Sequence, residues 1–594
     1  MFFSFSTASN CKRTAKIDSL FLFANLCLKL LKKRFAMPKY KFSYKNPLSH
    51  FLHVETVFNN LNGPVTLHLP LWRPGRYEIQ NFPKRIRGFK VTDNKGKQLP
   101  FKKTAKGTWT VDLQESSSLN VQYEYFAGLM DGGNTWLDDE QLYINPVNCC
   151  MYEPSLMNEG IELEFDLPSD YTLASGLKPN GKHQLLAKSY YQLVDSPIFA
   201  SNKLRTVNYS IEGYEFYIHI QGDVPQSDQQ LIDDFAPFTK KQIEVMRGFP
   251  CKHYHFLIQS LPYKAYHGVE HWNSTVICLG PSEDLSKREL YKELLGVSSH
   301  ELFHTWNVIR MRPKEMTPYN FQGENYHETG FITEGLTTYY GDLFLIRSGV
   351  FSLEEYLGEV NKLLKRHYEN EGRKNYSVAE SSFDLWLDGY EAGIPGRKVS
   401  IYNEGALAAM ILDLSIRLKF NNEKSLDDVV KALWTLRGEN LSGYTYQDYQ
   451  QVAEEVYEGS LDSYFEEIIS GTTPYENYLK ELFEEFGLDF KLTSAQKPEE
   501  RHYGFRLIDG KVVIIAPDSP AEVALSLGDQ ILKVNGEDLK NEFPGSESIE
   551  LEIMRMGRKK SIRLELGESE YFQVYQVQMG HGPNELLKRW LELE

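Results

Sequence analysis

The segment SSHELFHTW limits most strongly what this chain can fold into, because it contains a His-Glu-x-x-His motif within an amphipathic stretch. On a helix, His300 and His304 project from one face about one turn apart. Two imidazoles at that spacing can hold one zinc ion, and Glu301 lies beside them, where its carboxylate can take a proton from water. We therefore expect a helix here that follows a strand-rich segment and is closed by Pro313.

A catalytic zinc ion needs a third protein ligand and one open position. The segment GFITEGLTTYYGDL is typical of a second helix, and its Glu334 is the candidate that spacing favours. Glu324 and Glu328 are nearer in sequence but lie in QGENYHETG, which has the composition of a loop. His327 in the same stretch is a competing ligand.

The hydrophobic pattern changes along the 594 residues in a way that indicates several domains and a multidomain α+β protein. Alternating apolar residues, as in FLHVETVF, predict strands in the first third, whereas amphipathic helices dominate from about residue 284 to 490. The helix expected over 228–247 includes Pro237. We expect five segments: a dispensable N-terminal segment 1–36, a β domain 37–211, an α+β catalytic domain with a helical part 212–495, a small β-rich domain 496–567, and a C-terminal tail 568–594 that ends in a short helix.

Charge and cysteine usage exclude several classes of protein. The net charge is −16 and no basic stripe offsets it, so nucleic acid is not an expected partner. The six cysteines form no C-x-x-C pair, which predicts free thiols and favours a reducing, cytoplasmic location. Composition alone does not define an oligomeric state.

The first 36 residues differ from the rest of the chain. The apolar run from Ser19 to Leu28 is too short to span a bilayer, so we expect no membrane span. Basic residues follow this run where a signal peptide would carry them before it, and no small-residue cleavage site is present. We expect translation to start at Met37; periplasmic location or export is the alternative if residues 1–36 act as a signal.

Several segments together resemble the glycyl aminopeptidase family of gluzincin zinc metallopeptidases, in the branch that carries a C-terminal PDZ domain. The resemblance extends from about Tyr40 to Leu566. It implies a thermolysin-like catalytic domain for residues 212–495, one zinc ion and Glu334 as its third ligand. The segments that carry it are SHELFHTWNVIRMRP, FITEGLTTYYGDL, LPLWRPGRYEI, ESSFDLWLDGYE and VSIYNEGALAAMILDLSIR.

The resemblance implies roles for two further segments. HGVEHWNST is similar to the family's G-x-x-E-H segment, where the glutamate binds the free α-amino group of a substrate; Glu270 occupies that place, with Gly268 beside it. Tyr402 in IYNEG corresponds to the tyrosine of Y-x-K-G that stabilises the oxyanion.

This chain departs from the Y-x-K-G pattern because Glu404 stands where lysine is usual, which reverses the local charge. Arg397 or Lys398 is the nearby cation that we expect to compensate.

The C-terminal β-rich region resembles a PDZ domain in HYGFRL and SPAEVALSLGDQILKVNGEDL. Only nine residues separate Leu539 from Ile549, where a PDZ domain places the helix that walls its peptide groove. We expect this region to be a structural cap and not a binder of C-terminal peptides.

These features predict a zinc aminopeptidase that acts on peptides with a free N-terminus, and the resemblance implies a preference for small residues such as Gly or Ala. Three alternatives stay open: an endopeptidase, an epoxide hydrolase as in a related member of the clan, and a catalytically weak scaffold that binds peptides through its β-rich domains.

Overall fold

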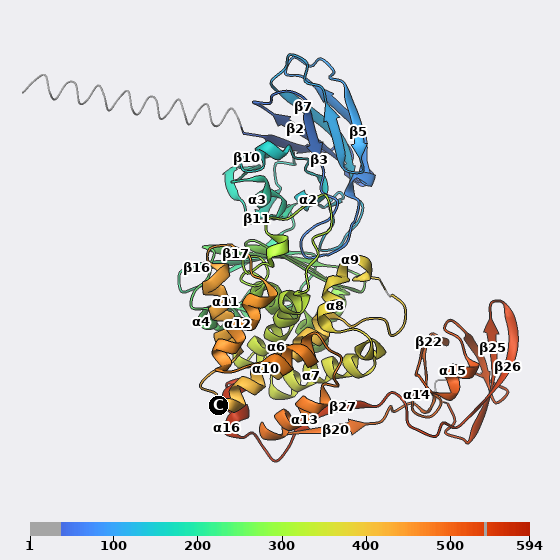
Figure 1. Cartoon of the computed structure of the whole chain (residues 1–594). Helices are drawn as coiled ribbons and strands as arrows, with labels where there is room; N and C mark the ends of the chain where they lie inside the picture. Colours follow the sequence, from blue (N-terminus) through green and yellow to red (C-terminus); the bar gives the residue numbers. More distant parts are fainter. Residues whose placement is uncertain (1–36, 392, 540–542, 594) are drawn as a thin grey trace, which may run out of the picture. The chain divides into compact units, whose positions relative to one another are not determined.

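The computed structural model describes residues 37–391, 393–539 and 543–593 (Figure 1). The prediction that residues 1–36 are dispensable, and the signal-peptide alternative, concern a segment outside these described residues. The chain divides into two compact units and has the expected multidomain α+β class, with a β-rich N-terminal region and a helical region. The first unit comprises residues 1–236, 249–305 and 318–325, and the second comprises residues 237–248, 306–317 and 326–594.

The N-terminal β region of the first unit is built on a seven-stranded sheet in the order β12-β13-β10-β1-β2-β7-β4. Strand β2 (Phe51–Phe58) has the alternating pattern that favours a β-strand: its side chains are half-buried and buried in turn along its whole length. It pairs antiparallel with β1 (Lys39–Ser43) and β7 (Leu119–Phe126), whereas β1 pairs parallel with β10 (Ile161–Phe165). The other strands are β4 (Ile86–Thr92), β12 (Lys178–Gly181) and β13 (Gln184–Ala187).

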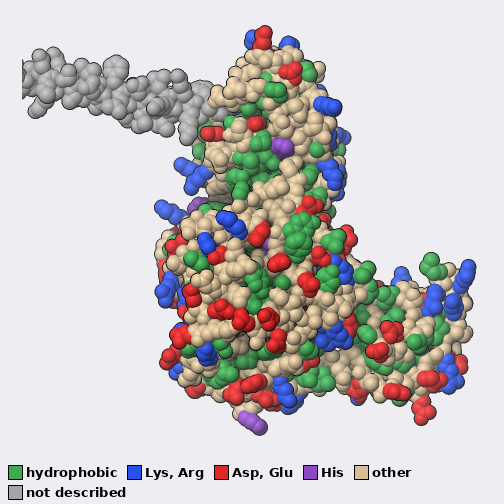
Figure 2. Space-filling model, viewed as in Figure 1, with side chains coloured by type: hydrophobic (Ala, Val, Ile, Leu, Met, Phe, Trp, Pro, Cys, Tyr) green, Lys and Arg blue, Asp and Glu red, His purple; other side chains and the backbone are tan. Residues whose placement is uncertain are grey.

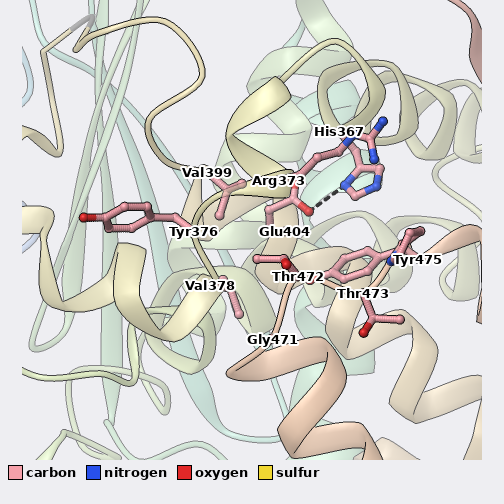
Figure 3. A pocket seen from close by; sticks show the side chains of 11 residues that line it. His367, Arg373, Tyr376, Val378, Val399, Glu404, Gly471, Thr472, Thr473 and Tyr475 are labelled. Atoms are coloured by element: carbon pink, nitrogen blue, oxygen red, sulfur yellow. Dashed lines mark hydrogen bonds and ion pairs between the residues drawn. The ribbon is translucent and has the colours of Figure 1, made fainter.

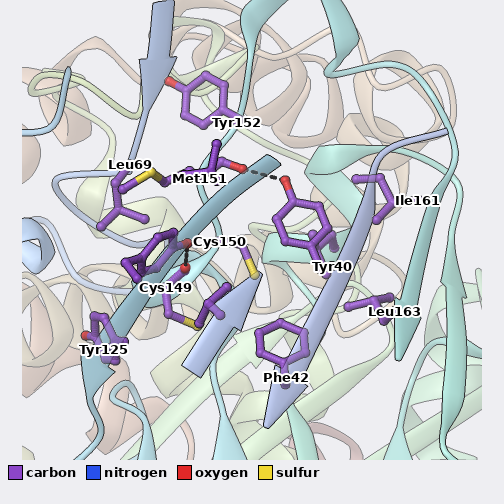
Figure 4. Packing of buried hydrophobic residues seen from close by; sticks show 14 of the residues in the cluster. Tyr40, Phe42, Leu69, Tyr125, Cys149, Cys150, Met151, Tyr152, Ile161 and Leu163 are labelled. Carbon is purple, nitrogen blue, oxygen red and sulfur yellow. Dashed lines mark hydrogen bonds between the residues drawn. The ribbon is translucent and has the colours of Figure 1, made fainter. Parts of the chain in front are cut away.

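The core of this region buries several tyrosine side chains among its apolar residues (Figure 4). The hydroxyl groups of Tyr40 and Tyr123 donate to the carbonyl oxygens of Met151 and Cys149. Burial raises the pKa of the Cys150 thiol well above its usual value, so this thiol stays protonated. In the described part of the chain, cysteines 149, 150, 251 and 278 are all free thiols, as predicted.

A mixed five-stranded sheet, in the order β15-β16-β17-β19-β18, forms the framework of the rest of the first unit. Strands β16 (Tyr214–Gln221), β17 (His253–Ser260) and β19 (Ser274–Gly280) run parallel, while β15 (Arg205–Ile211) and β18 (Ala265–His271) are antiparallel edges. Helix α5 (Arg288–Phe303) packs against β18 and β19. Helix α4 (Asp228–Met246) includes Pro237, as predicted.

The second unit is mainly helical and centres on α10 (Ile401–Lys419), which is buried along most of its length. Around α10 pack the π-helix η6 (Phe331–Leu336), α6 (Thr337–Arg347), α7 (Leu353–Tyr368) and α13 (Glu476–Glu485). Acidic and basic side chains are interspersed over the helical part on the face that Figure 2 shows. Among the described helices, none combines the length and apolar character needed to cross a membrane.

The C-terminal part of the second unit contains two further sheets and a helix. A six-stranded sheet encloses its own hydrophobic cluster, and β20 (Leu488–Thr493) pairs antiparallel with β27 (Val574–Met579). Helix α16 (Glu585–Leu591) follows, and its Trp590 is fully buried. The C-terminal residues are therefore part of the fold and not a free tail. The strands of the six-stranded sheet are β21 (Phe505–Ile508), β22 (Lys511–Ile515), β23 (Gln530–Val534), β24 (Glu537–Asp538), β25 (Ser548–Arg555) and β26 (Arg558–Glu565).

Residues 540–548 are the nine residues that stand where a PDZ domain would place the helix beside its peptide groove. Residues 543–547 contain no helix, and residues 540–542 lie outside the described part of the chain. The likeness to a PDZ domain and the role as a cap stay predictions.

Candidate active site

The two histidines of the motif lie at the C-terminal end of α5. The helix ends at Phe303, and His304 is its C-cap, so the prediction that Pro313 closes this helix is wrong: the chain leaves the helix through turns well before the proline. The Nε2 atoms of His300 and His304 are 2.9 Å apart, and their rings meet edge to face at 85°. Two imidazole nitrogens that converge in this way fit the donor set of zinc.

Glu301, between the two histidines in sequence, points toward the sheet. Its Oε2 accepts a hydrogen bond from the Thr275 hydroxyl on β19 at 3.3 Å, and the carboxylate is 5 % exposed. Gly268 on β18 leaves the space that this carboxylate occupies, because a Cβ atom there would lie 2.1 Å from Glu301 Oε1. The predicted Gly268 is therefore next to the predicted base, and its lack of a side chain is required there.

Glu270 reaches the same place from β18. One ligand atom each of Glu270, Glu301 and His304 lie within 4.8 Å of one another, and all three side chains are buried. Gly75, at φ +76°, lies against Glu270, since a Cβ atom there would be 2.5 Å from Glu270 Oε2. The first unit thus gathers two carboxylates and an imidazole from α5 and β18.

A buried charged cluster lies beside Gly268 on the same strand. His267 Nε2 is 3.1 Å from Arg73 Nη2 and its Nδ1 accepts from the Gly132 backbone N–H. Burial, together with the Arg73 charge, lowers the pKa of His267 to about 4. Burial alone would raise the pKa of Asp131, but His267 and Arg73 outweigh it and hold that pKa below its usual value.

Three residues of this site were not singled out from the sequence: Thr275, Arg73 and Gly75. The segment LPLWRPGRYEI contains the last two, and nothing in it indicates that Gly75 meets Glu270. Thr275 gives no local signal, because only the pairing of β18 with β19 brings it near the motif helix.

In the second unit, Glu334 lies on the π-helix η6 and is 2 % exposed. π-Helical turns are rare and often occur at functional sites. The Asn307 side-chain amide donates to the Ile332 carbonyl at 2.8 Å and holds this turn in place. Gly335 allows η6 to touch α10, because a Cβ atom there would lie 2.4 Å from Gly405 Cα.

The competing ligand candidates differ in burial. Glu324 and Glu328 are exposed, whereas His327 is buried. Burial lowers the pKa of His327 to about 4, although the charge of Glu334 acts in the opposite direction. His327 is therefore neutral near pH 7, and its Nδ1 contacts the Thr329 hydroxyl at 3.2 Å.

Tyr402 lies in the first turn of α10, half-buried, and Glu404 lies one residue beyond Asn403 in the same turn. The Glu404 carboxylate accepts from His367 Nδ1 at 2.6 Å and from the Asn403 amide at 3.2 Å, inside a small pocket (Figure 3). The unexpected carboxylate is therefore buried and bonded.

The cations expected to compensate Glu404 do not do so. Arg397 pairs with Asp384 and Asp388, and Lys398 Nζ lies 2.8 Å from Asp388. The prediction about these two cations is wrong because acidic residues close to them in sequence hold them. His367, which comes from the end of α7, is the partner that spacing did not indicate.

Comparison with protein families identifies two domains. Residues 39–202 match the Peptidase M61 N-terminal domain, and residues 293–408 match the M61 glycyl aminopeptidase domain. The second match contains His300, Glu301, His304, Glu334 and Tyr402. No curated protein matches the sequence.

Among solved structures, an aminopeptidase N family protein from Idiomarina loihiensis shares the fold, with a TM-score of 0.86 and 24% identity over 93% of this chain and 100% of that chain. The M1 zinc metallopeptidase from Deinococcus radiodurans gives a TM-score of 0.45 and 13% identity, over 74% of this chain and 93% of that one. A mutant of the Deinococcus protein bound to a Tyr-Ser-Ala substrate gives 0.45 and 14%, over 74% and 94%. Only the first of these likenesses is strong enough to define the fold.

Proposed function

We propose that this protein is a zinc-dependent aminopeptidase that removes the N-terminal residue of peptides, with a preference for small residues such as Gly or Ala. The observation that carries the proposal is the placement of a second buried carboxylate, Glu270, within 4.8 Å of Glu301 and His304. A hydrolytic site needs only one carboxylate as its base, so the second is available to bind the substrate. The match to the M61 glycyl aminopeptidase domain supports the same activity and the preference for small residues.

His300, His304 and Glu334 are the proposed zinc ligands. Support comes from the chemistry of the set, since two imidazoles and a carboxylate are typical ligands of catalytic zinc. Zinc, when bound, supplies Lewis acidity that activates water and polarises a carbonyl group.

Glu301 is the proposed general base. It takes a proton from the attacking water and returns it to the leaving amine, as one group can do both when it stays within hydrogen-bond reach. The hydrogen bond from Thr275 fixes one carboxylate oxygen, Oε2, and the absence of a side chain at Gly268 leaves the other, Oε1, free of steric conflict.

Glu270 is the proposed anchor for the substrate. A buried carboxylate favours a positively charged partner, and the α-ammonium group of a free N-terminus supplies that charge. Because Glu270 is at a fixed short distance from Glu301, a bound N-terminus places the first peptide bond at the site of attack. This arrangement favours an aminopeptidase over an endopeptidase.

Tyr402 is the proposed donor to the oxyanion that develops on the substrate carbonyl. Its helix begins at a capped residue, since the Ser400 side chain accepts from the Asn403 backbone N–H, and the Glu404–His367 bond ties that first turn to α7.

The decisive test combines metal analysis with a panel of aminoacyl amides and peptides that carry either a free or an acetylated N-terminus. We expect zinc in the purified protein, fastest release of Gly or Ala, and loss of cleavage on acetylation. Absence of zinc, or equal cleavage of acetylated peptides, would contradict the aminopeptidase; the second result would indicate an endopeptidase.

A further inference from the structure

The first turn of α10, residues 400–404, carries Tyr402 and is the part of this helix that its own backbone holds least. The first four N–H groups of a helix have no partner within the helix, so other groups must bond them. The cap at this end is weak, because the Asn403 backbone N–H donates to the Ser400 hydroxyl at 3.4 Å, beyond the usual range of about 2.7 to 3.2 Å. The direction of the Tyr402 side chain therefore depends on further contacts of this turn.

Backbone contacts hold one side of the turn. A Cβ atom at Gly405 would lie 2.8 Å from Gly335 Cα, so α10 and η6 touch main chain to main chain. Just before the helix, the Val399 backbone N–H donates at 3.2 Å to the hydroxyl of Ser381 on α8 (Val378–Phe383). These contacts set the separation of the backbones, but they do not by themselves set how the turn is rotated about the helix axis.

A hydrogen bond between buried side chains connects the turn to α7 (Figure 3). His367 Nδ1 donates to Glu404 Oε2 at 2.6 Å, and the two side chains are only 2 % and 4 % exposed. The other carboxylate oxygen, Oε1, accepts from the Asn403 amide at 3.2 Å. Hydrogen bonds to a carboxylate are short and strong, so this pair connects the first turn of α10 firmly to the end of α7.

The His367 ring is itself held in place by its neighbours. It stacks on Tyr475 with ring centroids 4.8 Å apart and planes at 15°, and it meets Tyr368 edge to face at 4.7 Å. Among the described residues, its second nitrogen, Nε2, is buried without a hydrogen-bond partner. Two aromatic contacts and the bond to Glu404 therefore fix the ring, which gives α10 a rigid partner.

The geometry of a helix links Glu404 to Tyr402. Successive residues are about 100° apart around the axis, so two residues at this spacing project about 200° apart, from nearly opposite sides of the turn. A rotation of the turn that moved Tyr402 would also move Glu404 away from His367. That movement would leave a buried N–H group without its acceptor, which is unfavourable.

We propose that His367 and Glu404 are positioning residues for Tyr402, because their hydrogen bond holds the first turn of α10 in the rotation at which the Tyr402 hydroxyl donates to the oxyanion. This inference rests on the role proposed above for Tyr402. Glu404 and His367 act through the turn and not on the substrate. The carboxylate that replaces the usual lysine of Y-x-K-G is therefore matched by a histidine from another helix.

The kinetic test uses the full-length protein and a glycine or alanine amide. Glu404→Leu and His367→Leu should each lower kcat about tenfold with little change in KM, because the substrate still binds while the oxyanion loses an aligned donor. Glu404→Gln keeps an acceptor and His367→Asn keeps a donor in nearly the same place, so each should retain about half of kcat or more. Equal losses in the conservative and the leucine variants would overturn the proposal.

A cycle of double variants tests whether the pair acts through Tyr402. Added to Tyr402→Phe, Glu404→Leu should lower the melting temperature but should not lower kcat further, and a second tenfold loss of kcat would overturn the proposal. Tyr464→Phe is the matched control, because it removes a buried hydrogen bond from η9 (Tyr464–Ile469) to the Ala408 carbonyl, one turn further along α10. This control should lower the melting temperature and leave kcat unchanged.

A measurement that does not depend on catalysis separates this inference from the proposed function. Fluorotyrosine placed at position 402 gives a fluorine resonance that reports the surroundings of that ring. The resonance should shift or broaden in Glu404→Leu and stay unchanged in Glu404→Gln and Tyr464→Phe.

An unchanged resonance in Glu404→Leu would overturn the positioning role even in a protein that cleaves peptides. The expected shift in a protein that releases no amino acid would support the positioning of the ring and contradict the peptidase. Circular dichroism checks that each variant folds, and His367→Leu alters the same hydrogen bond from α7 if Glu404→Leu does not fold.

Discussion

The two histidine pairs of the first unit differ in what surrounds them and hardly at all in their own geometry. The ring nitrogens of His300 and His304 at the end of α5, and those of His253 and His255 on β17, are 2.9 Å apart in each pair, with the rings near a right angle. The α5 pair has Glu301 and Glu270 beside it, whereas the β17 pair has an amide and a third imidazole. The carboxylates therefore distinguish the α5 pair, because the proposed hydrolysis needs a base.

The largest expected effect comes from removing the base of the α5 pair. The Glu301→Gln variant should lose at least about 10²-fold in kcat, because the amide cannot accept the proton of the attacking water. Its metal content should not change. Steady-state kinetics with elemental analysis of the same sample measures both, and unchanged kcat would break the distinction drawn between the two pairs.

The next effect concerns the second carboxylate. The Glu270→Gln variant should lose roughly 10²-fold in kcat/KM on substrates with a free N-terminus, since the α-ammonium group loses its charged partner. Its residual rate on acetylated peptides should match that of the unaltered protein. A variant that still discriminates strongly against acetylation would show that another group holds the N-terminus.

A smaller effect is expected from a single methyl group at Gly268. In the Gly268→Ala variant the new Cβ would lie 2.1 Å from Glu301 Oε1, so the carboxylate must move and kcat should fall about tenfold. Gly358 on α7 is a matched control, because nothing lies within 4 Å of a Cβ atom there. The Gly358→Ala variant should keep full activity and unfold at the same or a higher temperature.

The smallest expected effect concerns how protein stability depends on pH. The folded-state pKa of His267 is lowered to about 4, so the unfolded chain binds more protons between that value and pH 6.5. The stability that neutral His267 contributes is present above pH 6.5 and is lost as the pH falls toward 4, by at most about 1.4 kcal/mol per pH unit. Thermal unfolding from pH 7.5 to 5 should become less pH-dependent in the His267→Gln variant, and an unchanged slope would exclude this group as the cause.

The sequence predicted the parts of the site that depend on local spacing. The helix of the motif and the helix of Tyr402 are both present, because hydrophobic periodicity and capping act over a few residues. Residues brought in by distant pairing were missed: Thr275 depends on the register of β18 with β19, and Gly75 comes from another region of the chain.

One wrong prediction and one strand pairing that was not predicted have a common physical cause. The ion pairs of Arg397 and Lys398 depend on which acidic side chains the local fold places near them. The pairing of β20 with β27 joins two segments that are separated in sequence by the whole six-stranded β region. Charge counting and strand propensity do not contain that information. The same limit applies to the β17 pair, whose surroundings come from three other parts of the chain.

The glycine contact between η6 and α10 has a consequence for how this protein could be altered. Gly335 and Gly405 bring the two backbones together without intervening side chains, and Glu334 and Tyr402 lie close in sequence to either side of that contact. The separation of these two residues is therefore set by main chain alone. The side chains around Glu334 and Tyr402 could therefore be changed to suit a different amino acid, while the distance between the two helices stays the same.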